Sequence, residues 1–233
     1  MTGNKAIVVG ASGGIGAAVA RALAEQGIDT LLMGRDADKL APVVADCTDA
    51  GARAIPLVCD IARLDALETM VAEAIEQLGG LNFLINCAGV SARGKLHETD
   101  PSSSDSIINT NLRAHYYIAR YALPEINKQA GGAVVKIGSV NHSYSGVNTY
   151  QAANLAIDAY AEALFEDVRE FGTRVCTIKP GYVNTALVTS DKLNPDLMIQ
   201  PEDIAKTVLF VLTMPTTACP TEITIFPQRS PYR

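Results

Sequence analysis

The chain has 233 residues, of which 48% are hydrophobic and 19% charged, and its net charge is −6. This length suits one large core, and the composition is ordinary for a globular protein. A net negative charge gives no electrostatic reason to bind nucleic acid or an anionic membrane. The N-terminus leads directly into a short apolar run, and no run reaches the about 18 residues of a membrane span. We therefore expect a soluble, cytoplasmic protein with a single domain over residues 1–233.

The five cysteines, at positions 47, 59, 87, 176 and 219, are odd in number and lie mostly in apolar runs. Buried free thiols in a reducing compartment explain them better than disulfides. No CxxC motif or Cys/His pair suggests a metal, so the sequence predicts no metal site.

Apolar, β-branched runs alternate with segments of helical spacing along the chain. Runs such as AIVV and FLI lack polar alternation, which fits strands buried on both faces of a parallel sheet. The pattern predicts an α/β fold: a doubly wound Rossmann fold with a seven-stranded, mostly parallel sheet and helices on both faces. The predicted strands cover 5–9, 29–33, 54–59, 81–86, 133–138, 174–179 and 222–226. The predicted helices cover 14–26, 37–50, 63–78, 104–129, 151–170 and 202–213.

Pro56 lies inside the third predicted strand, where proline is tolerated only at a sheet edge or a bulge. A sheet of order 3-2-1-4-5-6 places that strand at an edge, so the proline agrees with the topology. The longest polar or irregular stretches follow strands, where the ligand sites of such folds lie. We expect substrate loops at about 90–105, 140–149 and 186–200.

Three glycines, Gly10, Gly14 and Gly16, join the first predicted strand to the first helix in VVGASGGIGAAVA. Glycine lets the backbone turn tightly and approach a pyrophosphate, whose charge the helix N-terminus favours. The alternative is a glycine-rich turn without a ligand. Because these glycines lie between a strand and a helix, the dinucleotide site is favoured.

The spacing GxxxGxG resembles that of the short-chain dehydrogenase/reductase family, and the resemblance covers nearly the whole chain. NCAG at 86–89 resembles the family's NNAG, and KPGYVNT resembles its PG motif. Two departures, Val9 for threonine and Cys87 for the second asparagine, remove polar contacts near the adenine end. The resemblance implies cofactor contacts at Gly10, Ser12, Gly14, Ile15, Gly16, Arg35, Asp60, Ile61, Asn86, Ala88, Gly89, Tyr150, Asn154, Pro180, Gly181, Val183 and Thr185.

The end of the second strand, LLMGRD, indicates which cofactor binds. An acid here would bind the ribose 2′-hydroxyl of NAD, whereas an arginine pairs with the 2′-phosphate of NADP. Gly34 occupies the acidic position and Arg35 follows it, so NADP is favoured and NAD remains the alternative. Asp36 is the competing acid, although it also suits the cap of the next helix. Gly13 stands where NADP-preferring members often carry another arginine.

Tyr150 and Asn154 are four residues apart on a predicted helix, so their side chains share a face. The resemblance implies that Tyr150 gives a proton to the substrate oxygen, that Ser139 holds this oxygen and that Asn111 supports a water chain. Asn154 replaces the family's lysine, which binds the ribose and favours the ionised tyrosine. These four residues form the predicted catalytic set; Ser143 and Ser145 compete with Ser139, and Asn109 lies near Asn111.

The asparagine at position 154 carries no charge. A phenol with an unperturbed pKa of about 10 is only roughly 0.1% ionised at pH 7, which deprives alcohol oxidation of its base. Carbonyl reduction needs the neutral phenol, so we expect a bias to reduction, with oxidation only at high pH. Lys136, Lys179 and His142 are candidate replacement cations. Strand alternation places Lys136 on the opposite face from Ser139, which favours His142.

The expected substrate loops carry a mixed lining. Arg93 with Lys95 suits either a carboxylate ligand or a solvated loop pair. The sequence predicts an NADP(H)-dependent oxidoreductase that reduces a small or medium carbonyl compound to an alcohol. The alternatives are an NADP(H)-binding pseudoenzyme, acting as sensor or assembly partner, and non-redox chemistry at the Tyr/Ser site. Resemblance also implies a homodimer or homotetramer. The residues expected to line the substrate site are Tyr144, Arg93, His97, Tyr182 and Met198.

Overall fold

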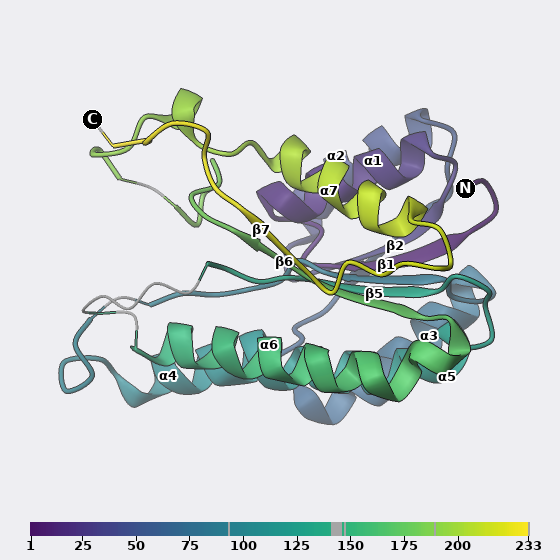
Figure 1. Ribbon diagram of the computed structural model, residues 1–233, viewed down its shortest axis with the longest axis horizontal. Helices are drawn as coiled ribbons and strands as arrows, with labels where there is room; N and C mark the ends of the chain where they lie inside the picture. Colours follow the sequence, from purple (N-terminus) through teal and green to yellow (C-terminus); the bar gives the residue numbers. More distant parts are fainter. Residues whose placement is uncertain (93, 141–145, 147, 189, 233) are drawn as a thin grey trace.

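The chain folds around a single parallel sheet (Figure 1). The computed structural model describes residues 1–233 apart from residues 93, 141–145, 147, 189 and 233. Within these residues the sheet has seven strands in the order β3-β2-β1-β4-β5-β6-β7, and every neighbouring pair is parallel. The doubly wound fold is thus confirmed. The strands are β1 (Lys5–Val9), β2 (Asp29–Gly34), β3 (Ala54–Val58), β4 (Phe83–Asn86), β5 (Ala133–Ile137), β6 (Arg174–Pro180) and β7 (Glu222–Ile225).

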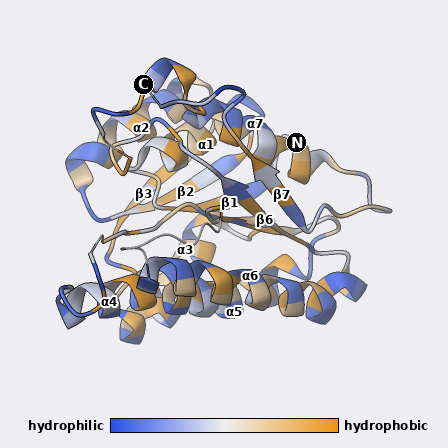
Figure 2. Cartoon of the chain, turned by 60° about the vertical axis from the view of Figure 1, so that its left-hand side comes forward, coloured by the Kyte–Doolittle hydropathy of each residue, from blue (hydrophilic) through white to orange (hydrophobic). Residues whose placement is uncertain are grey.

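Helices form a layer on each face of the sheet (Figure 1). One layer holds α1 (Gly14–Glu25), α2 (Ala37–Asp49) and α7 (Pro201–Thr213). The other holds α3 (Leu67–Leu78), α4 (Pro101–Ile107), α5 (Ala114–Ile126) and α6 (Asn148–Val168). Figure 2 shows hydrophobic and hydrophilic residues alternating along α5 and α6, as expected of helices with one face on a sheet. Among the described helices, none is long and apolar enough to cross a bilayer.

Strand alternation divides the core into two parts. Along β5, Val135 and Ile137 pack with the α1 and α7 residues, while Val134 packs with α5 and α6. All five residues of this strand are buried, which explains why the run AVV shows no polar alternation.

Pro56 lies in β3, and β3 is an edge strand that pairs only with β2. Pro56 stands opposite Leu32 in this pairing. The expected edge position of the proline is confirmed, because the other side of β3 has no neighbouring strand that would need its missing N–H.

The predicted helix at 104–129 is wrong at its start and in its regularity. Asp100 accepts a hydrogen bond from the backbone N–H of Ser102 at 2.8 Å, and Pro101 occupies the first turn, so α4 begins at Pro101. The loop expected at 90–105 therefore ends at residue 100. A π-helical segment, Ile108–Arg113, separates α4 from α5. Such segments occur often at functional sites.

Candidate active site

A cavity of about 160 Å³ lies at the carboxyl edge of the sheet, where the loops after β1, β2, β3 and β4 meet. This is the edge at which open α/β sheets bind ligands. Seven of the expected cofactor residues line it: Gly10, Ser12, Arg35, Asp60, Ile61, Ala88 and Gly89. The other lining residues are Val9, Gly13, Met33, Gly34, Cys59, Cys87, Val90 and Thr110.

The glycine turn beside this cavity has no room for side chains. Gly10 has φ +80°, and a Cβ on it would lie 2.7 Å from the Cα of Ala88. A Cβ on Gly16 would lie 2.2 Å from the Gly10 carbonyl oxygen. The backbone N–H groups of Gly10 and Ala11 donate to the Met33 carbonyl oxygen, which fixes the turn against β2. A backbone held this closely at a helix N-terminus fits a phosphate-bearing dinucleotide.

Residues 34–36 follow the end of β2, and Gly34 and Arg35 line the cavity. A Cβ on Gly34 would lie 2.9 Å from Ser12 Oγ, so a side chain at this position would displace its neighbours. Asp36 accepts hydrogen bonds from the N–H groups of Asp38 and Lys39 and caps α2, as expected. The Lys39 N–H holds the pKa of Asp36 below its usual value. Arg35 lines the cavity and makes no ion pair within the described residues.

The remaining expected cofactor residues lie outside the cavity lining. Thr185 packs on the start of α1, since a Cβ on Gly14 would lie 2.8 Å from its Cγ2. Gly181 donates its N–H to the Ile225 carbonyl oxygen, which ties the PG motif to β7. Asn86 is buried and faces a second cavity under α5 and α6. The set outside the cavity lining is Gly14, Ile15, Gly16, Asn86, Tyr150, Asn154, Pro180, Gly181, Val183 and Thr185.

Four lining residues were not expected at the cofactor site: Met33, Cys59, Val90 and Thr110. Met33 and Cys59 lie at or next to the ends of their strands, a position that the strand pattern itself could have indicated. Thr110 reaches the cavity from the π-helical segment, which the sequence pattern does not distinguish from an ordinary helix.

Asn111 lies in the π-helical segment and is buried. Its Oδ1 accepts from the Val90 N–H at 2.9 Å, and its Nδ2 donates to the Val90 carbonyl oxygen at 2.8 Å. Asn111 therefore holds the loop after β4, which lines the cavity at the carboxyl edge of the sheet. Asn109, near it in sequence, instead accepts from Arg113 at 3.1 Å.

Asn154 turns back onto its own helix. Its Nδ2 donates to the Tyr150 carbonyl oxygen at 2.8 Å, and the residue is only 4% exposed. Tyr150, in the first turn of α6, is half-buried. Ser139 follows β5 and its Oγ donates to the Val140 carbonyl oxygen at 3.4 Å. The competing serines at 143 and 145 lie outside the described residues.

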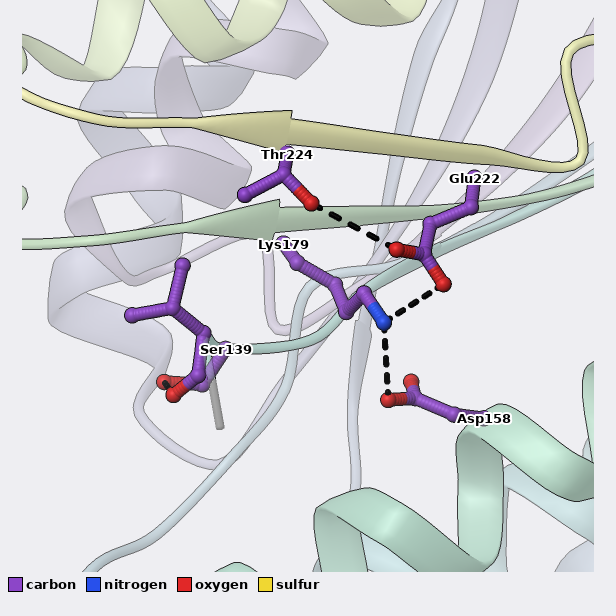
Figure 3. Close-up of polar contacts among 6 residues, drawn as sticks. Ser139, Asp158, Lys179, Glu222 and Thr224 are labelled. Carbon is purple, nitrogen blue, oxygen red and sulfur yellow. Dashed lines mark hydrogen bonds and ion pairs between the residues drawn. The ribbon is translucent and has the colours of Figure 1, made fainter. Parts of the chain in front are cut away.

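The three candidate replacement cations have different outcomes. His142 lies outside the described residues. Lys179 has its amine between two carboxylates, Asp158 at 3.3 Å and Glu222 at 2.5 Å, as Figure 3 shows. Lys136 is buried on the sheet face that α5 and α6 cover. Lys136 therefore faces the layer that contains α6, the helix that carries Tyr150. The expected placement of Lys136 on the opposite face of the strand from Ser139 does not separate Lys136 from this helix.

The expected substrate residues are only partly described. Arg93 and Tyr144 lie outside the described residues. Lys95 pairs with Glu98 at 3.5 Å on the surface, as a solvated loop pair would. The exposed His97 lies at the same distance from Glu98.

The C-terminal tail contacts residues near the expected substrate loop at 186–200. The Tyr182 hydroxyl contacts that of Tyr232, and their rings pack edge to face. Leu193 forms an antiparallel bridge with Tyr232. Met198, which was expected to line the substrate site, is buried. Tyr232 therefore contacts the loop at 186–200, and the sequence analysis did not predict this contact.

The comparisons with known proteins agree with this architecture. Residues 4–196 match the family model for short chain dehydrogenase. An uncharacterized oxidoreductase of Staphylococcus aureus is 30% identical, with 97% of this chain and 98% of the relative covered. A Burkholderia cenocepacia short chain dehydrogenase in complex with NADP superposes with a TM-score of 0.90 at 29% identity, covering 97% of each chain. A metagenomic short-chain oxidoreductase in complex with NADP has a TM-score of 0.86 at 28% identity, covering 98% of this chain and 99% of its own.

The chain belongs to the short-chain dehydrogenase/reductase family of oxidoreductases.

Proposed function

We propose that this protein is an NADP(H)-dependent reductase that converts a small or medium carbonyl compound to an alcohol. The observation that carries the proposal is the cofactor cavity, where the glycine turn excludes side chains and Arg35 stands at the rim. Tyr150 in the first turn of α6 and Ser139 after β5 supply the groups that the reaction needs from the protein.

The preference for NADP rests on three consecutive residues. Gly34 leaves no acid for a ribose 2′-hydroxyl, and Asp36 is engaged by the backbone of α2. The guanidinium of Arg35, without an ion pair in the described part of the chain, suits a 2′-phosphate. Both similar structures that contain NADP support this assignment by analogy.

The chemistry divides between cofactor and protein. A reduced nicotinamide, when bound, supplies the hydride that adds to the carbonyl carbon. The Tyr150 hydroxyl gives its proton to the carbonyl oxygen, so that the carbonyl gains two electrons and two hydrogens in all. Ser139 donates a hydrogen bond to the same oxygen and stabilises the charge that develops there. Asn111 contributes indirectly, by holding Val90 in the cofactor loop.

Asn154 explains the expected bias to reduction. Its amide is neutral, buried and bonded to its own helix, so it supplies no charge that would stabilise an ionised tyrosine. The bias concerns kcat at saturating substrate, because the equilibrium constant fixes the ratio of kcat/KM in the two directions. The same buried amide favours the second candidate function, an NADP(H)-binding protein without turnover.

The proposal is tested by measuring consumption of NADPH with a panel of ketones, after binding of the cofactor is shown by fluorescence. We expect turnover in the wild type, loss of turnover in Tyr150→Phe, and faster alcohol oxidation at neutral pH in Asn154→Lys. Binding of NADPH without turnover in any of the three proteins would instead support the cofactor-binding protein.

A further inference from the structure

The loop after β4 is held in place at both of its ends. The Cys87 N–H donates to the last residue of β1 at 2.9 Å, which continues the pairing of the two strands. Asn111 binds both backbone groups of Val90. Between these fixed ends lies the peptide group that joins Ala88 to Gly89, and both residues line the cavity at the carboxyl edge of the sheet.

His115 binds the carbonyl oxygen of this peptide group. It lies on α5, is 1% exposed and places its Nε2 2.9 Å from the Ala88 carbonyl oxygen. A carbonyl oxygen can only accept, so Nε2 carries the proton and donates. Lys136 of β5 adds a longer contact, with its Nζ 3.5 Å from the same oxygen. Two buried side chains therefore direct this carbonyl toward the core under α5 and α6.

His115 is the stronger donor of the two. The shorter bond of Lys136, at 2.6 Å, goes to the Ile137 carbonyl oxygen and not to Ala88. Burial and, after it, the charge of Lys136 lower the pKa of His115 well below its ordinary value. The ring is therefore neutral at neutral pH, and its single N–H is the one that Ala88 accepts.

The orientation of the peptide group decides which of its atoms faces the cavity. In a trans peptide, the C=O and the N–H of the next residue point in opposite directions. Because the Ala88 oxygen points into the core, the Gly89 N–H points to the other side, where Gly89 lines the cavity. Within the described residues this N–H has no hydrogen-bond partner. It is a donor at the cavity wall.

Glycine at position 89 leaves this orientation open to change. Turning the peptide group over would carry Gly89 from its present φ, which is not positive, into the left-handed region, where glycine is not strained. The local backbone alone therefore does not fix the direction of the Gly89 N–H. The bond from His115 fixes it, because the turned peptide would leave a buried donor unpaired, which costs free energy.

We propose that His115, assisted by Lys136, is a positioning residue that directs the Gly89 N–H into the cavity as a hydrogen-bond donor to the dinucleotide. The acceptor is a ribose or phosphate oxygen, because Gly89 and the glycine turn line the same cavity. His115 does not line this cavity and acts through the Ala88–Gly89 peptide. Only the identity of the ligand rests on the proposed function.

The first test observes the Gly89 amide by NMR in protein that is isotopically labelled at the glycine nitrogens. The Gly89 resonance is the one that Gly89→Ala removes. We expect a single Gly89 resonance in the wild type, and it should shift when NADPH is added. In free His115→Leu the resonance should be broadened or doubled, because the peptide then adopts both orientations. His115→Gln should restore the single resonance, since the glutamine Nε2 reaches as far as the histidine Nε2 and donates.

The second readout is the Kd for NADPH, measured by cofactor fluorescence. It should rise roughly 3- to 10-fold in His115→Leu, rise less in Lys136→Met and return to the wild-type value in His115→Gln. His115→Asn, whose amide is too short to reach Ala88, repeats the test if the leucine variant does not fold.

The matched control is Ile118→Val. Ile118 lies on the same helix as His115, is fully buried and packs in the apolar core. The loss of a methyl group should lower the Tm but leave both the Kd and the Gly89 resonance unchanged. A merely structural role of His115 would instead make His115→Leu behave as this control.

A single Gly89 resonance and an unchanged Kd in His115→Leu would overturn the inference. A wild-type Gly89 resonance that does not shift when NADPH binds, or a failure of His115→Gln to restore it, would do so as well. A Gly89 resonance that shifts with NADPH and depends on His115, in a wild type that reduces no ketone, would support the inference and contradict only the proposed reductase.

Discussion

At the scale of single residues, the proposed preference for NADP depends on Arg35. Gly34 before it has no side chain, and Asp36 after it is engaged by the α2 backbone. Arg35 is thus the charged side chain of this trio that remains available to a ligand.

Arg35→Ala should weaken NADPH binding and leave NADH binding nearly unchanged. A charge-assisted pair with a phosphate contributes about 1.5–3 kcal/mol, so we expect the Kd for NADPH to rise roughly 10- to 100-fold. Titration of the cofactor fluorescence measures both constants. An equal loss for the two cofactors would assign Arg35 to another part of the dinucleotide.

Lys136 should make stability depend on alkaline pH. Its folded pKa, about 8, lies below the unfolded value of about 10.5. Between these values the unfolded chain binds more protons, so the free energy of unfolding rises with pH. Below about pH 8 the buried charge destabilises the fold by up to about 3 kcal/mol, and above about pH 10.5 this effect is gone.

The free energy of unfolding of the wild type, relative to Lys136→Met, should therefore rise between about pH 8 and pH 10.5. Urea denaturation at several pH values measures this difference. A difference between wild type and Lys136→Met that does not change with pH would show that Lys136 is not buried as a charge.

At the scale of elements, the sequence predicts each strand and most helices because burial on both faces leaves apolar runs without alternation. It misplaces the start of the helix at α4, although Asp100, Pro101 and Ser102 form a recognisable helix start. The π-helical segment could not be predicted. Its residue Asn111 bonds the Val90 backbone, a contact between residues 21 apart in the sequence that no local pattern reveals.

The cap of α2 provides a test at this scale. Asp36→Ala removes an acceptor for the N–H groups of Asp38 and Lys39, so the Tm should fall by a few degrees. The KM for NADH should not change, because the cap and not the cofactor engages this carboxylate. Asp38→Ala is the control, and calorimetry with steady-state kinetics gives both quantities. A selective rise of the KM for NADH would make Asp36 a cofactor residue.

At the scale of the whole molecule, the fold brings part of the predicted cofactor site together at one cavity. The roles of the predicted catalytic residues stay predictions. The glycine turn, Arg35, Asp60 and the loop after β4 meet at one cavity because the carboxyl ends of parallel strands share an edge. The sequence names Lys136 as a candidate cation, but alternation along β5 gives only its face of the sheet and not the helices that cover this face. The tail contact of Tyr232 joins segments 50 residues apart and leaves no local pattern.

The exposed surface of α5 and α6 is a candidate interface between copies of this chain. Tyr116 of α5 is 40% exposed and Leu155 of α6 is 49% exposed, so both helices present apolar surface to solvent. We propose that these helices pair in a homodimer or homotetramer. Leu155→Lys should dissociate the assembly, as sedimentation velocity would show, whereas Phe171→Lys, at an exposed site beyond the end of α6, should not. A monomeric wild type would contradict this.

The most direct test of the account is a single turnover with NADPH that carries deuterium on the transferred position of the nicotinamide, mixed with a ketone at about pH 6.5. We predict deuterium on the carbinol carbon of the alcohol, formed at least about 100-fold more slowly by Tyr150→Phe. Absence of deuterated alcohol from wild type that binds NADPH, or an equal rate in Tyr150→Phe, would contradict the claim that Tyr150 drives carbonyl reduction here.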